Sequence, residues 1–120
     1  MKLAEIKILL PEKVSTNTIY AGVHWSVRQK HTVLFQNYLW HLKGKINIKT
    51  YPVEISYRFT FKRNPLDTTN VSYMAKLLED ALVVHRVIDG DNPSHVAATH
   101  VYSEKGPEDA VTIEICSTRT

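Results

Sequence analysis

Three aspartates in the second half of the chain have the chemistry of magnesium ligands. Asp91 follows Asp80 across a turn that can fold the chain back beside the preceding segment, and Asp67 stands upstream of both. Mg²⁺ prefers a few carboxylate oxygens and keeps several of its waters. We therefore predict a metal site formed by Asp67, Asp91 and Asp80, with Mg²⁺ as the expected ion and Mn²⁺ as a substitute.

Each of these residues also has a simpler interpretation. Asp67 is a plausible helix N-cap, Asp91 is an ordinary turn residue, and Lys76 with Asp80 is an ordinary surface pair one helical turn apart. A lysine that precedes its aspartate is, however, the weaker order for a pair that only stabilises a helix. This order favours a role for Lys76 beyond helix support.

Local patterns predict the elements that must position these side chains. Pro11 marks the end of a first strand, and Gly44 marks the end of a long amphipathic helix. The predicted strands cover residues 3–10, 51–62, 96–103 and 110–117, the last two forming a hairpin, and the predicted helices cover residues 24–42 and 69–84. We expect a single α+β domain over residues 1–120. It has two layers, a mixed sheet of about four strands and two main helices, in the order strand, helix, strand, helix, strand, strand.

The two clearest elements each have one apolar face. Between residues 51 and 62 apolar and polar side chains alternate strictly, which is typical of a strand with one buried face. At 100° per residue, the second helix gathers its apolar side chains within one third of its circumference. This predicted buried stripe consists of Val71, Met74, Ala75, Leu78, Ala81 and Leu82, whereas Tyr73, Lys76, Leu77 and Asp80 fall on the opposite face.

Charge is unevenly distributed along a chain whose net charge is only +3. Residues 1–63 hold 11 basic and 3 acidic side chains, whereas residues 64–120 hold 4 basic and 9 acidic ones. A basic half could neutralise DNA phosphates while an acidic half gathers metal ions. Two differently charged solvated faces are the alternative. The basic surface expected to bind DNA consists of Arg28, Lys30, Arg58, Lys62 and Arg63.

Bulk properties point to a reducing compartment and away from membranes. The first residues carry charges at Lys2, Glu5 and Lys7 where a signal peptide needs an apolar centre, and no apolar run reaches the roughly 18 residues of a membrane span. The single cysteine, Cys116, cannot form an internal disulfide. We expect a cytoplasmic protein with no membrane partner and no small-molecule cofactor.

Two segments resemble the RusA-type Holliday junction resolvases. The first runs from Asp67 through Asn70, Lys76 and the Asp80-Ala81-Leu82 triplet to Val87-Ile88 and Asp91, and it is similar to the family's catalytic core. The second contains Ser15-Thr16-Asn17 with His24-Trp25 and Arg28 downstream, and it looks like the family's Ser-x-Asn entry segment. The resemblance covers about residues 8–115.

The resemblance implies a homodimer that uses magnesium to cut four-way DNA junctions. Carried over by position, Asp67 and Asp91 are metal ligands, Lys76 is a cation directed at the scissile phosphate, Asn17 belongs to the DNA-binding segment, and Asn70 supports the site. The sequence departs from the family at Thr69, where a second aspartate is expected, and at Gly90, where many members have an acid.

Three hypotheses follow for the function. The first is a magnesium-dependent endonuclease that resolves branched DNA by paired symmetric nicks during DNA recombination and repair. The second is a junction-binding protein that keeps the basic surface but has lost catalysis through Thr69. The third is an unrelated structural or interaction domain. Magnesium-dependent cleavage of a four-way junction distinguishes the first from the other two.

Overall fold

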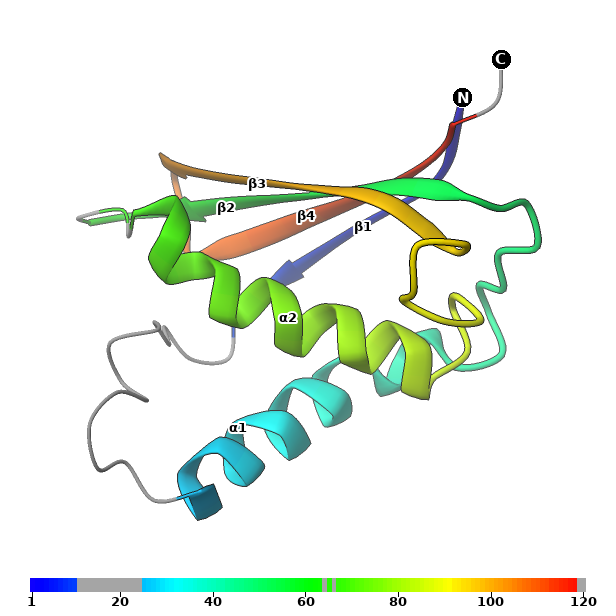
Figure 1. The fold of residues 1–120 in the computed structure, drawn as a ribbon. Helices are drawn as coiled ribbons and strands as arrows, with labels where there is room; N and C mark the ends of the chain where they lie inside the picture. The colour runs from blue at the N-terminus through cyan, green and yellow to red at the C-terminus, as the bar shows by residue number, and fades with distance from the viewer. Residues whose placement is uncertain (11–24, 64, 66, 119–120) are drawn as a thin grey trace.

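The computed structural model describes residues 1–10, 25–63, 65 and 67–118, with the backbone alone at residues 25–28, 69 and 70 (Figure 1). Within this part of the chain, one mixed sheet has the strand order β1-β4-β2-β3. Strand β2 pairs in parallel with β3 and antiparallel with β4, which pairs antiparallel with β1. The strands are β1 (Lys2–Leu9), β2 (Val53–Phe61), β3 (Val96–Lys105) and β4 (Ala110–Ser117).

Two α-helices, α1 (Trp25–Tyr38) and α2 (Thr68–Val84), lie on the same side of the sheet (Figure 1). The α+β class, the mixed four-stranded sheet and the predicted order of elements are confirmed. The first helix was predicted to run on to Leu42, but α1 ends at Tyr38 and a 3₁₀-helix, η2 (Trp40–Leu42), follows. Such tightening is common at helix C-termini. Among the described helices, none is long and apolar enough to cross a membrane.

The predicted hairpin between the last two strands is wrong, because β4 lies between β1 and β2 and does not pair with β3. Apolar content explains the order: β4 buries Val111, Ile113 and Ile115 completely, whereas most of β3 is exposed and suits a sheet edge. The loop from β3 to β4 therefore crosses the end of β2, where the Gly106 amide donates to the Phe61 carbonyl at 2.9 Å.

The inward face of β2 forms the centre of the core. Its five inward side chains are fully buried, and the side chains that alternate with them face away from the helices, as predicted. The predicted stripe of α2 packs against this face, and all six of its residues are buried. The inward residues of β2 are Val53, Ile55, Tyr57, Phe59 and Phe61.

Helix α2 is covered on two sides, by the sheet and by α1. Leu77 is buried although it lies opposite the predicted stripe, because α1 packs over that side of the helix. Two buried histidines link the helices: His31 Nδ1 lies 3.2 Å from the Tyr73 hydroxyl, and His85 Nε2 lies 2.5 Å from the Gln36 carbonyl. Both histidines therefore have structural roles.

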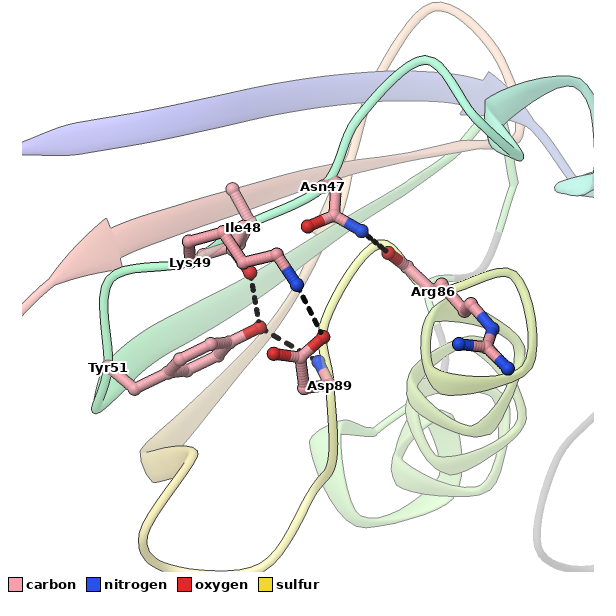
Figure 2. A network of polar contacts seen from close by, with 6 residues as sticks. All are labelled: Asn47, Ile48, Lys49, Tyr51, Arg86 and Asp89. Atoms are coloured by element: carbon pink, nitrogen blue, oxygen red, sulfur yellow. Dashed lines mark hydrogen bonds and ion pairs between the residues drawn. The ribbon is translucent and has the colours of Figure 1, made fainter.

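A polar network fixes the turn that leads from α2 to β3 (Figure 2). The Tyr51 hydroxyl donates to the Ile48 carbonyl at 2.6 Å and accepts from the Asp89 amide at 2.8 Å. Lys49 forms an ion pair with Asp89 at 3.4 Å. The two bonds of the Tyr51 hydroxyl hold the backbone at Asp89 against the segment before β2, and they thereby position Asp91 two residues further on. The Lys49–Asp89 ion pair is exposed and contributes little to this.

Candidate functional site

Lys76 lies between two carboxylates on the solvent side of α2. Its Nζ is 3.0 Å from Asp80 Oδ1, one helical turn away, and 3.4 Å from Asp91 Oδ2, which comes from the turn after the helix. The hydrogen bond to Asp80, with the negative charges of both aspartates, raises the pKa of Lys76 above its ordinary value of 10.5. The lysine therefore stays protonated at neutral pH.

The predicted folding-back of the chain after α2 does bring Asp91 beside the helix. Asn92 fixes the turn beyond it, because its side-chain oxygen accepts from the Ser94 amide at 3.0 Å and lies 3.0 Å from His95 Nδ1. The His95 ring also packs edge-on against Tyr51, with the ring centroids 4.9 Å apart. Asp91 is thus held between two anchored segments.

Glu79 is a residue of the site that sequence reasoning missed. The fully buried Tyr57 donates its hydroxyl to Glu79 Oε1 at 3.1 Å, and Thr99 of β3 donates to the same oxygen at 3.3 Å. Burial raises the pKa of Glu79 above its ordinary value, and the two hydrogen bonds oppose that rise. A tyrosine on the buried face of a strand needs a partner for its hydroxyl, which is the signal that could have indicated such a residue.

Beside Lys76 and Glu79 is a cavity of about 180 Å³ between α2 and β3. Its walls combine an ammonium, a carboxylate and two hydroxyls with two small apolar side chains, so it can take a group with both polar and apolar parts. The lining residues are Ser72, Ala75, Lys76, Glu79, Thr99 and Val101.

Asp67 stands apart from the other two predicted ligands. It occupies the N-cap position of α2 but makes no side-chain capping bond there. Since α2 rises by roughly 1.5 Å per residue, Asp67 lies about 20 Å along the helix from Asp80. Within the described part of the chain, no three His, Cys, Asp or Glu side chains are grouped closely enough to hold a metal ion. Thr69 and Asn70 lie in the first turn of α2, and their side chains are outside the described part of the structure.

The described DNA-binding candidates lie on different elements. Arg58 lies on the sheet face opposite α2, where it pairs with Glu104 at 3.3 Å and lies over the Tyr102 ring, 4.2 Å from its centroid. Lys62 and Arg63 are exposed just after β2, and Lys30 is exposed on α1. Asn17 and the side chain of Arg28 lie outside the described residues.

Comparison with models of known protein families gave no match, and a search of curated proteins gave none either. The assignment of a function therefore depends on the residues themselves and on their arrangement.

Proposed function

We propose that this protein is a magnesium-dependent endonuclease that cuts four-way junctions or other branched DNA by paired nicks. The observation that carries the proposal is Lys76 between Asp80 and Asp91 on the exposed side of α2. Two carboxylates and a cation at one place combine groups that can hold Mg²⁺ with a group that can bind a phosphate. The resemblance of the same segment to RusA-type resolvases supports this choice of substrate.

In this proposal Mg²⁺ would have two protein ligands, Asp80 and Asp91. Because Asp80 Oδ1 and Asp91 Oδ2 lie 3.0 Å and 3.4 Å from one nitrogen, they are at most about 6.4 Å apart. One or two carboxylates, completed by waters and substrate phosphate oxygens, are a common magnesium environment. When bound, Mg²⁺ or Mn²⁺ would neutralise charge on the scissile phosphate. Asp67 would not join this set without a rearrangement.

The chain's own residues divide the remaining work. Asp80 and Asp91 would turn from Lys76 to the metal ion, and Lys76 would then pair with the scissile phosphate. Glu79 joins α2 to the two strands that carry Tyr57 and Thr99. These contacts would hold the part of α2 that carries Lys76 at a constant distance from the sheet. The cavity beside Lys76 would hold part of the substrate next to the reacting phosphate.

A homodimer suits this reaction, because a four-way junction has two equivalent strands and one site of this size cuts one of them at a time. The basic N-terminal half would supply phosphate contacts that do not depend on metal. We expect the enzyme to act in recombination or repair in the cytoplasm, where the single thiol of Cys116 would stay reduced.

Binding to junctions without cleavage is the second candidate function. The separation of Asp67 from Asp80 and Asp91, together with Thr69 in place of an expected acid, favours it. The test incubates the purified protein with a synthetic four-way junction, with and without Mg²⁺, and measures both binding and cleavage. Cleavage that requires Mg²⁺ supports the endonuclease, whereas tight binding with no product under any metal supports the second candidate. Absence of both refutes the two.

A further inference from the structure

An exposed tryptophan and several cations lie where α1 ends and η2 begins. Trp40 begins η2 with 64% of its surface exposed. Lys43 is the C-cap of η2, three residues after Trp40. The Lys43 amide donates to the Trp40 carbonyl at 3.0 Å, which fixes this spacing.

Arg86, in the turn after α2, adds a further cation. Asn47 donates to the Arg86 carbonyl at 3.0 Å and the Ile48 amide donates to the Val87 carbonyl at 2.8 Å, so the segment that carries Lys43 and Lys45 is tied to this turn. Figure 2 shows the Arg86 guanidinium directed away from the contacts around Tyr51. Arg86 has a φ of 59°, a left-handed conformation that favours glycine.

Most of the cations in this part of the described structure have no acidic partner. The sequence contains no Asp or Glu between Glu12 and Glu54. Of Lys43, Lys45, Lys49 and Arg86, only Lys49 has an acidic partner, Asp89. Lys43, Lys45 and Arg86 are exposed and form no ion pair with any described residue. An anionic ligand with a planar, apolar part would satisfy both the ring and the cations.

We propose that Trp40, Lys43, Lys45 and Arg86 bind a single-stranded segment of nucleic acid, with one base stacked on Trp40 and neighbouring phosphates on the cations. Base stacking on aromatic rings beside basic side chains is the common way in which proteins hold unpaired strands without reading sequence. Val84, where α2 ends, lies about 12 Å along the helix from Lys76, and Arg86 follows it, so this surface is separate from the candidate catalytic site. The proposal rests on the proposed function for its DNA partner but not on cleavage.

Fluorescence of Trp40 tests the proposal directly. In a Trp25→Phe background Trp40 is the only tryptophan, and its emission should be quenched on titration with a 12-nucleotide oligothymidylate. Trp40→Ala should weaken binding of a labelled oligonucleotide by about five- to 150-fold, and Trp40→Phe should retain most of the affinity because it keeps a stacking ring. Equal affinity for Trp40→Ala and the unaltered protein would overturn the stacking contact.

Salt dependence tests the cations. The double variant Lys43→Gln, Lys45→Gln should have a weaker salt dependence. The negative slope of log affinity against log salt should become shallower by about 1.4, since each phosphate contact on a single strand contributes about 0.7. The matched control is Lys2→Gln with Lys7→Gln, which removes the same charge from β1 and should leave the slope unchanged. Equal slopes for both variants would overturn the proposal. So would quenching by phosphatidylserine vesicles or by an acidic peptide but not by the oligonucleotide.

The two proposals fail separately. Trp40 quenching in a protein that never cuts junctions would refute the endonuclease and leave the single-strand surface intact. Magnesium-dependent cleavage with no Trp40 quenching would do the reverse.

Discussion

Replacing Lys76 by glutamine should tighten magnesium binding while it removes cleavage. In the unaltered protein the Lys76 ammonium occupies the space between Asp80 Oδ1, at 3.0 Å, and Asp91 Oδ2, at 3.4 Å. An ion at about 2.1 Å from Asp80 Oδ1 would lie at most about 5 Å from the ammonium, because that oxygen is 3.0 Å from Lys76 Nζ. The lysine therefore competes with the metal for its ligands and repels it.

The size of the effect follows from this geometry. Repulsion between a divalent ion and one positive charge at about 5 Å is about 1.7 kcal/mol in water, or roughly 15-fold in affinity. The Lys76 side chain is 62% exposed and can turn toward solvent, where salt screens it. We therefore expect Lys76→Gln to bind Mg²⁺ about five- to 15-fold more tightly than the unaltered protein.

Calorimetric titration with MgCl₂ in the absence of DNA measures this change. Lys45→Gln is the matched control, because it removes the same charge from an exposed loop with no acidic partner among the described residues. Its magnesium affinity should not change. Magnesium binding that is unchanged or weaker in Lys76→Gln would refute the reasoning, because Asp80 and Asp91 would then not be the ligands.

Other perturbations test the surroundings of the site and the assembly. Burial raises the pKa of Glu79 above 4.5, so its contribution to the free energy of unfolding is present below pH 4.5 and is lost as pH rises through the folded-state pKa. Glu79→Gln should therefore gain stability relative to the unaltered protein as pH rises from about 4.5. Urea unfolding measures this, and a difference in free energy of unfolding between the two proteins that does not change with pH would contradict it. At Gly106 an added Cβ would lie 2.7 Å from Thr60 Cβ, so Gly106→Ala should lower the free energy of unfolding by about 1–3 kcal/mol, measured by the same method. Sedimentation should detect a homodimer, and a strict monomer both with and without junction DNA would count against paired nicking.

Local patterns predicted those features that depend on neighbouring residues in the chain. The alternation in β2 and the stripe of α2 follow from side-chain periodicity, and both are buried as expected. The return of Asp91 to the side of α2 was predicted because only one turn separates it from the helix, whereas its ion pair with Lys76 was not. The helical rise alone would have separated Asp67 from Asp80, since both lie along one continuous helix.

Features that depend on distant segments could not be predicted in the same way. The position of β4 beside β2 depends on which strand best covers the inward face of β2, a comparison across the whole sheet. Glu79 accepts a hydrogen bond from the Tyr57 hydroxyl, which belongs to another element, so only the complete fold brings the two together. Its type and its place in the sequence resemble those of an ordinary surface carboxylate.

Single-turnover cleavage of a four-way junction by Asp91→Asn and Asp89→Asn tests the central claim most directly. The two residues lie in the same turn, but Asp91 contacts Lys76 whereas Asp89 contacts Lys49. With saturating Mg²⁺ we predict that Asp89→Asn cuts at the rate of the unaltered protein, and that Asp91→Asn binds the junction without cutting it. Equal cleavage by both variants would contradict the assignment of Asp91 and, with it, the proposed endonuclease site.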